Sequence, residues 1–218
     1  MPRITTVIFD LDGTLLNTLE DLADSTNYAL AQYGMPQRTI EEVRAFVGNG
    51  VRKLMERAVP EGTDEVRFEA VFDCFKRYYV DHCKVKTGLY PGVMELLVTL
   101  KAEGYKVAVV SNKLQGGVDE LYRSYFSDTV QVAVGERAGV SRKPAPDMVE
   151  IALRELGSSA GEAVYVGDSE VDVATAAGAG LPCISVLWGF RDRDFLKQNG
   201  AVRFADSPAD VWVLLREL

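Results

Sequence analysis

Histidine and cysteine are scarce in this chain of 218 residues. It has one histidine, His82, and three cysteines, Cys74, Cys83 and Cys183, with no Cys-x-x-Cys spacing. A structural zinc site needs several such ligands and a disulfide framework needs paired cysteines, so we expect neither. A Ser-His-Asp triad would have to use His82, which lies far along the chain from the acidic motifs, and we expect no such triad.

Long apolar runs and an excess of positive charge are also lacking. No stretch approaches the roughly 18 apolar residues of a membrane span, and only the short run Val7–Phe9 precedes Asp10, unlike a signal peptide. With 24 Lys and Arg against 32 Asp and Glu, the net charge is −8, which disfavours nucleic acid and anionic membranes as partners. We therefore expect a cytoplasmic protein with reduced thiols; the sequence leaves its oligomeric state open.

Apolar runs alternate with helical patterns along most of the chain. Because the runs are nearly continuously apolar, they are typical of parallel strands covered on both faces. The runs are Ile4–Phe9, Lys106–Val110, Thr129–Val134, Ala163–Val166 and Cys183–Leu187. Helices are expected between them, after Pro91, from Pro146 as a first helical position, and over Val171–Ala179. This alternation predicts an α/β fold with a doubly wound parallel sheet and right-handed crossovers.

The interval between the first two runs is much longer than one crossover requires. Its patterns predict a helix that starts at a capping box, Asn17-Thr18-Leu19-Glu20, with Asn17 as the N-cap. Three more helices are predicted over Ile40–Val47, Val51–Ala58 and Val66–Val80, the last with an aromatic stripe at helical spacing. We therefore predict an inserted all-helical domain over residues 16–85 and a core domain made of residues 1–15 and 86–218.

Polar side chains follow four of the predicted strands. Ligands of parallel α/β sheets bind beyond the carboxyl ends of the strands, so these side chains are candidates for one site. In chain order they are Asp10 and Asp12, Ser111 and Asn112, Lys143, and Asp168 with Asp172.

Carboxylates, one lysine and a hydroxyl–amide pair suit a divalent cation and a phosphate group. Hard oxygen ligands favour Mg²⁺, which takes one or two carboxylates together with substrate oxygens. Held ionised by the cation, Asp10 could attack phosphorus to give an aspartyl-phosphate. Asp12 could protonate the leaving alkoxide and then activate water. Lys143, Ser111 and Asn112 would hold the phosphoryl oxygens. A small phosphorylated metabolite is the expected partner.

The four motifs, in their order and spacing, resemble those of the haloacid dehalogenase-like hydrolase superfamily. The matching segments are Asp-Leu-Asp-Gly-Thr-Leu, Ser-Asn, Lys-Pro and Gly-Asp-Ser-x-x-Asp. The resemblance implies a Rossmann-like core, with Asp10 as nucleophile and Asp12 as acid/base. It also implies Mg²⁺ bound by Asp10, the Asp12 carbonyl and Asp168, with support from Asp172. The helical insertion resembles the C1-type cap of this superfamily, a lid that excludes water.

The acid at position 12 bears on the reaction, because the dehalogenases of the superfamily lack a second aspartate there. Asp12 therefore favours phosphoryl transfer. The segments Asn17–Leu30, Gly48–Gly50, Tyr90–Gly92 and Trp188–Phe190 resemble phosphoglycolate phosphatases most, which implies that 2-phosphoglycolate is the substrate. A β-phosphoglucomutase-like isomerase, a pyrophosphatase or nucleotidase, and a non-catalytic module that binds a phosphorylated ligand are the alternatives.

Residues that select the substrate are expected in the helical insertion. Gly48-Asn49-Gly50 suggests a turn where backbone can approach a ligand, and Arg52 follows it. We predict that Asn49 and Arg52 contact the non-phosphate end of the substrate; a solvated helix face is the other reading of Arg52.

Overall fold

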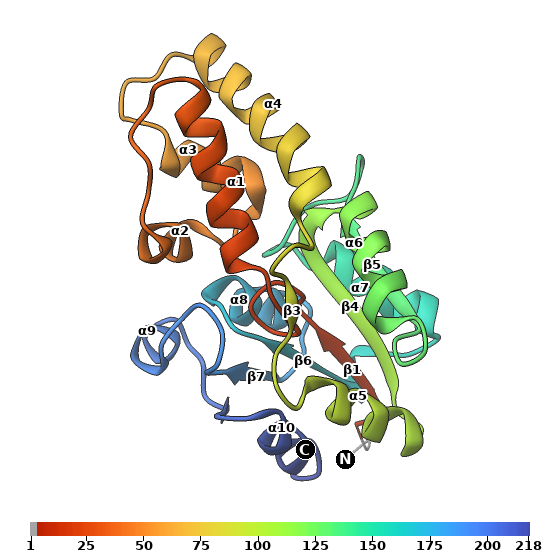
Figure 1. Cartoon of the computed structure of the whole chain (residues 1–218). Helices are drawn as coiled ribbons and strands as arrows, with labels where there is room; N and C mark the ends of the chain where they lie inside the picture. Colours follow the sequence, from red (N-terminus) through yellow and green to blue (C-terminus); the bar gives the residue numbers. More distant parts are fainter. Residues whose placement is uncertain (1–3) are drawn as a thin grey trace. The chain divides into compact units, whose positions relative to one another are not determined.

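The computed structural model describes residues 4–218, which form two compact units (Figure 1). One, the core unit, contains the described residues up to Leu15 together with Leu89–Leu218, and the other, the helical unit, contains Leu16–Gly88. Residues 1–3 of the predicted core segment 1–15 lie outside the described residues. Across residues 4–218, every helix is too short or too polar to cross a membrane.

The core unit is built on a six-stranded parallel sheet with the order β5-β4-β1-β6-β7-β8. Its strands are β1 (Thr6–Phe9), β4 (Lys106–Leu114), β5 (Val132–Glu136), β6 (Ala163–Gly167), β7 (Cys183–Val186) and β8 (Phe204–Ala205). The predicted doubly wound α/β fold and its five strands are confirmed, with shifted ends. Strand β8 was not predicted, because two residues are too few to show a pattern. Central strand β1 pairs with β4 and β6, and all four of its residues are buried.

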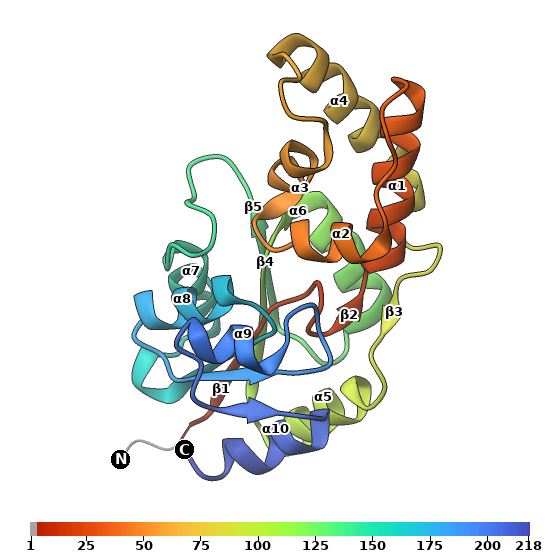
Figure 2. The same cartoon turned by 90° about the vertical axis from the view of Figure 1, so that its left-hand side faces the viewer.

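Helices cover both faces of this sheet (Figure 2). They are α5 (Val93–Ala102), α6 (Gln115–Leu121), α7 (Asp147–Leu156), α8 (Glu170–Gly178), α9 (Arg193–Gln198) and α10 (Pro208–Leu215), with a π-helical turn at Tyr122–Phe126 and a 3₁₀ turn at Ala160–Glu162. Helix α7 packs on β4 and β5, and α8 on β6 and β7. Helices α5 and α10 pack together on the other face.

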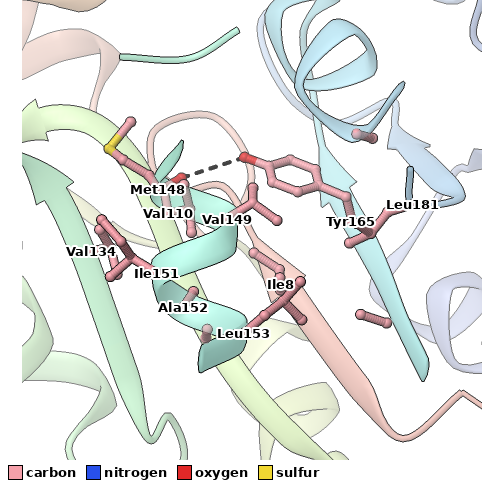
Figure 3. Packing of buried hydrophobic residues seen from close by; sticks show 13 residues of the cluster. Ile8, Val110, Val134, Met148, Val149, Ile151, Ala152, Leu153, Tyr165 and Leu181 are labelled. Atoms are coloured by element: carbon pink, nitrogen blue, oxygen red, sulfur yellow. Dashed lines mark hydrogen bonds between the residues drawn. The ribbon is translucent and has the colours of Figure 1, made fainter. Parts of the chain in front are cut away.

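The core under α7 is assembled from alternate strand residues (Figure 3). Ile8, Val110, Val134 and Tyr165 are buried in one cluster with α7 residues such as Met148. Side chains two apart along a strand share a face of the sheet, so Ala163 belongs to the same cluster as Tyr165. The four strands contribute together because they are neighbours in the sheet. Only the hydroxyl of Tyr165 is polar in this set, and it points toward the ends of the strands where the motif residues lie.

The helical unit contains α1 (Leu19–Gln32), α2 (Ile40–Phe46), α3 (Gly50–Ala58) and α4 (Glu65–His82), and the predicted helices are confirmed. Helix α1 packs along α4. The predicted aromatic stripe of α4 forms a series of stacked rings, Phe68, Phe72, Phe75 and Tyr79. Two short strands, β2 (Leu16–Asn17) and β3 (Gly88–Leu89), pair as a separate two-stranded sheet.

The predicted start of α1 was wrong. Thr18, not Asn17, is the N-cap, and within the described residues its hydroxyl has no hydrogen-bond partner. Asn17 belongs to β2, so its backbone is paired with another strand, and its side chain reaches the Leu19 amide at a long 3.4 Å. Glu20 forms an ion pair with Lys86 at 3.4 Å. A helix start that follows a paired strand directly leaves no room for the expected capping box.

Candidate active site

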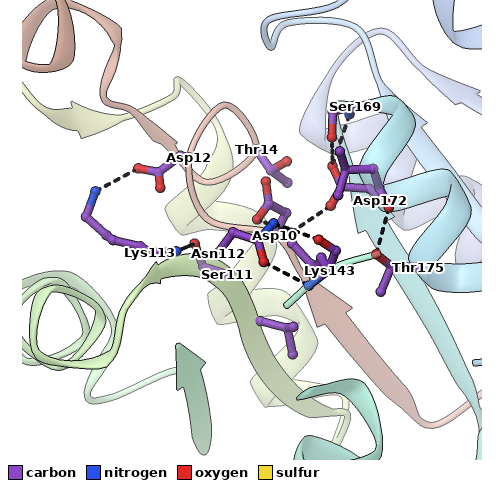
Figure 4. Close-up of polar contacts among 12 residues, drawn as sticks. Asp10, Asp12, Thr14, Ser111, Asn112, Lys113, Lys143, Ser169, Asp172 and Thr175 are labelled. Atoms are coloured by element: carbon purple, nitrogen blue, oxygen red, sulfur yellow. Dashed lines mark hydrogen bonds and ion pairs between the residues drawn. The ribbon is translucent and has the colours of Figure 1, made fainter. Parts of the chain in front are cut away.

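The polar residues predicted at four strand ends meet at one edge of the core sheet (Figure 4). Asp10 follows β1 directly and Asp168 follows β6, and these two strands are neighbours. Ser111 and Asn112 lie in β4 on the other side of β1, in the part of β4 where pairing with β5 is irregular. The strand therefore continues past the predicted end at Val110, but its regular pairing stops there.

Lys143 lies at the centre of this cluster. Its Nζ donates to Asp10 Oδ1 at 2.6 Å, to Asp172 Oδ1 at 2.8 Å and to the Tyr165 hydroxyl at 3.1 Å. The side chain of Lys143 is 3% exposed. Burial alone would lower the pKa of this ammonium group, but the charges of Asp10 and Asp172 outweigh it and hold the pKa well above its usual value. Lys143 is thus a fixed positive charge beside Asp10.

Asn112 holds the backbone of Lys143. Asn112 Nδ2 donates to the Lys143 carbonyl at 3.1 Å, and the Lys143 amide donates to Asn112 Oδ1 at 2.9 Å. Both polar atoms of the Asn112 side chain are therefore used to position the loop after β5, in which the Lys143–Pro144 peptide bond is cis. The predicted contact between Asn112 and phosphate stays a prediction.

Three buried carboxylates surround the position next to Lys143. Oxygen atoms of Asp10, Asp168 and Asp172 all lie within 4.8 Å of one another. Burial and the charge of Asp172 raise the pKa of Asp10 well above its usual value, although Lys143 opposes the shift. Burial and Asp172 likewise raise the pKa of Asp168 to about 7. Three carboxylates face one ammonium group here, so the donor set and its excess negative charge fit a divalent cation.

The two oxygens of Asp172 have different partners. Oδ2 accepts from the Ser169 amide at 3.0 Å and from the Ser169 hydroxyl at 2.6 Å, at the start of α8. Oδ1 accepts from Lys143 and from the Tyr165 hydroxyl, the latter at 3.2 Å. Asp172 therefore closes the first turn of its helix and also fixes Lys143.

Two glycines leave the space that Asp168 occupies. A Cβ atom at Gly13 or at Gly189 would overlap the Asp168 side chain, and Gly13 also has φ +92°, a conformation that favours glycine. Asp168 Oδ2 accepts from the Phe190 amide at 2.7 Å, and Oδ1 accepts from the Thr14 hydroxyl at 3.4 Å. The loops after β1 and β7 thus hold Asp168 in place.

Asp12 forms an ion pair with Lys113 (Figure 4). Lys113 Nζ donates to Asp12 Oδ1 at 3.1 Å, and the side chains are 5% and 18% exposed, respectively. The Lys113 amide donates to Ser111 Oγ at 3.2 Å. The acid/base candidate therefore has its own cation, separate from Lys143.

Asn49 and Arg52 lie in the helical unit, where each has partners of its own. Arg52 forms ion pairs with Glu56, Glu65 and Glu69, and Asn49 Oδ1 accepts from Arg57 Nη2 at 2.9 Å. Their predicted role in substrate selection stays a prediction.

Two residues of the cluster were missed in the sequence. Tyr165 lies inside an apolar strand, where a tyrosine is read as core. Lys113 directly follows Ser111 and Asn112, and a lysine after a strand is read as a solvated residue. The position of Lys113 directly after the Ser-Asn motif was the signal in the sequence that could have identified it as a site residue.

Comparison with known proteins identifies the family of this chain. Residues 7–186 match the model of the haloacid dehalogenase-like hydrolase family. A phosphoglycolate phosphatase of Pseudomonas syringae pv. tomato is 33% identical over 216 residues, covering 94% of this chain and 77% of that protein. Another phosphoglycolate phosphatase, from Mesorhizobium japonicum, is 34% identical and covers 86% of this chain and 84% of that one.

Solved structures share the fold. The crystal structure of a predicted phosphoglycolate phosphatase from Haemophilus somnus superposes with a TM-score of 0.90 at 30% identity, covering 98% of this chain and 99% of that one. The matched region contains Asp10, Lys143, Asp168 and Asp172. This chain belongs to the haloacid dehalogenase-like hydrolase family.

Proposed function

We propose that this hydrolase is a Mg²⁺-dependent phosphatase that cleaves 2-phosphoglycolate through an aspartyl-phosphate on Asp10. The observation that carries the proposal is the buried cluster in which Lys143 bonds to Asp10 and two further carboxylates lie beside it. The names of the relatives support the choice of ester, since both sequence relatives are phosphoglycolate phosphatases.

In the first step, an Asp10 oxygen attacks phosphorus and the bond from phosphorus to the ester oxygen breaks. The electron pair stays on the ester oxygen, which takes a proton from Asp12 and leaves as an alcohol. In the second step, Asp12 removes a proton from water, whose oxygen attacks phosphorus and displaces Asp10. Lys143 and Ser111 hold the phosphoryl oxygens, and Asn112 assists through its two hydrogen bonds to the Lys143 backbone.

The predicted metal residues fit Mg²⁺. Asp10, Asp168 and the Asp12 carbonyl would bind the ion directly, and Asp172 would support it. Bound Mg²⁺ supplies positive charge that neutralises the phosphate and keeps the neighbouring carboxylates ionised.

The helical unit, Leu16–Gly88, is proposed to serve as the cap domain. The compactness of this unit supports the proposal; the predicted insertion covers residues 16–85. A cytoplasmic location and the absence of nucleic acid and membrane partners stay predictions from charge and composition.

Release of inorganic phosphate from 2-phosphoglycolate, with Mg²⁺ and with a chelator, tests the proposal. We expect turnover in the presence of Mg²⁺ and none with the chelator. Asp10→Asn should show no turnover. The control Asp128→Asn, which alters an exposed aspartate of the core unit, should keep normal turnover. Full activity of Asp10→Asn would contradict the aspartyl-phosphate. Interconverted sugar phosphates without phosphate release would instead indicate a mutase.

A further inference from the structure

Lys113 is a buried cation that the mechanism above does not use. Its side chain is 5% exposed and its partner is Asp12, the proposed proton donor. A Cβ atom at Gly117 would lie 3.5 Å from three carbons of the Lys113 side chain, so the lysine stem runs over the first turn of α6. Because stem and ammonium group are both held, the charge has a defined position in the site.

The ammonium group of Lys113 lies beside the proposed proton donor, and little water reaches it. Opposite charges interact strongly where water is excluded. A cation in this place therefore favours a substrate with an anionic group close to its ester oxygen.

The leaving group must lie close to this point. Its ester oxygen has to be within hydrogen-bond reach of the Asp12 carboxyl group, and Lys113 Nζ is 3.1 Å from Asp12 Oδ1. An anion one methylene group away from the ester oxygen would therefore reach the ammonium group. Lys143 lies instead between Asp10 and Asp172, beside the proposed nucleophile.

We propose that Lys113 binds the carboxylate of the leaving group and so selects phosphate esters of 2-hydroxy carboxylates. This inference rests on the proposed function and names the core-unit residue that recognises its substrate.

The test compares kcat/KM for 2-phosphoglycolate and for its neutral carboxamide, which has nearly the same shape. For the unaltered enzyme we expect the carboxylate to be preferred by about 10- to 100-fold, the value of a charged hydrogen bond. In Lys113→Met the preference should fall to within a few-fold of unity, and Lys113→Arg should restore part of it. Lys101→Met, which removes an exposed lysine bonded to the Asp128 carbonyl, is the matched control and should keep the full preference.

If Lys113 has only a structural role, Lys113→Met lowers kcat/KM for both esters by the same factor and leaves their ratio unchanged. That result would overturn the inference. If that variant does not fold, equal kcat/KM values of the unaltered enzyme for the two esters would overturn it just as well. In both cases phosphate release from 2-phosphoglycolate persists and the proposed function stands. If neither ester releases phosphate in the presence of Mg²⁺, both the inference and the proposed function are overturned.

Discussion

Tyr165 combines a core residue and a site residue in one side chain. Its ring is buried under α7, while its hydroxyl accepts from Lys143 Nζ at 3.1 Å and donates to Asp172 Oδ1 at 3.2 Å. We expect Tyr165→Phe to keep the packing but to leave the Lys143 ammonium with one acceptor fewer, lowering kcat by about tenfold. Steady-state kinetics with 2-phosphoglycolate measure this.

The matched control for that variant is Tyr122→Phe. It removes a hydroxyl that donates to the Val130 carbonyl at 3.1 Å, outside the cluster of charged residues. Its kcat should be unchanged. An equal fall of kcat in the two variants would contradict a specific role for the Tyr165 hydroxyl.

Gly189 is needed for the space that it leaves. A Cβ atom there would overlap the Asp168 Cβ and the Gly13 carbonyl, so Gly189→Ala must move Asp168. We expect the Mg²⁺ concentration for half-maximal rate to rise by about 10- to 100-fold, the usual effect of disturbing the support of a ligand. Gly116→Ala, where a Cβ atom meets nothing within 4 Å, is the control and should bind Mg²⁺ normally; an unchanged requirement in Gly189→Ala would show that Asp168 can bind the ion after moving.

At the scale of helices, Arg52 connects α3 to α4. It forms ion pairs with Glu65 and Glu69 and lies over the rings of Phe68 and Phe72, 5.0 and 5.5 Å from their centroids. Because the Arg52 side chain is 37% exposed, solvent weakens each of these ion pairs. We expect Arg52→Ala to lower Tm by about 2–4 °C and to change the rates on all phosphate esters by one factor.

The control is Lys53→Ala, which removes a more exposed lysine paired with Glu56 in the same helix, and its Tm should hardly change. Thermal unfolding and a panel of esters separate the two roles of Arg52. Altered relative rates in Arg52→Ala at unchanged Tm would support the substrate-selecting role predicted from the sequence.

Which elements could be predicted depends on how their residues are buried. The strands were found because both faces of the sheet are covered, which makes each one continuously apolar. Helix α6 was missed, since it begins Gln115-Gly116-Gly117 and glycines obscure a helical pattern. Helices α9 and α10 are short and show too few turns for a clear periodicity.

The site was predictable where side chains follow strands and less so elsewhere. Asp10 and Asp168 belong to motifs directly after β1 and β6, so topology alone brings them together. The contact of Asn112 with phosphate stays a prediction. Its amide group also binds the Lys143 backbone, a contact between loops that no local pattern encodes. The pairing of Lys113 with Asp12 likewise depends on the irregular end of β4.

For the molecule as a whole, the buried carboxylates link stability to pH. The pKa of Asp168 is raised to about 7 in the folded protein by burial and by Asp172, whereas an unfolded aspartate has a pKa of about 3.9. The folded state thus holds the Asp168 proton more tightly than the unfolded state does. The contribution of this proton to the free energy of unfolding is therefore complete below pH ~4 and is lost as pH rises through about 7. Burial shifts the pKa of Asp10 in the same direction. The raised pKa of Lys143 adds nothing to the pH dependence of stability in this range, because Lys143 stays charged in both the folded and the unfolded protein.

Metal-free protein should therefore become less stable between pH 6 and pH 8, and Mg²⁺ should restore the loss. The ion binds the ionised carboxylates and competes with protons at pH 6, so its stabilisation grows with pH and follows RT ln(1 + [Mg²⁺]/Kd). We expect the rise of Tm on adding Mg²⁺ to be larger at pH 8 than at pH 6, measured at constant ionic strength because a chain of net charge −8 also responds to salt. Asp168→Asn removes one repelling charge; it should be more stable than the unaltered protein at pH 8 without Mg²⁺ and should respond weakly to the ion. A Mg²⁺ effect that is equal at both pH values, or that survives in Asp168→Asn, would mean that the ion stabilises the protein at a place other than these carboxylates.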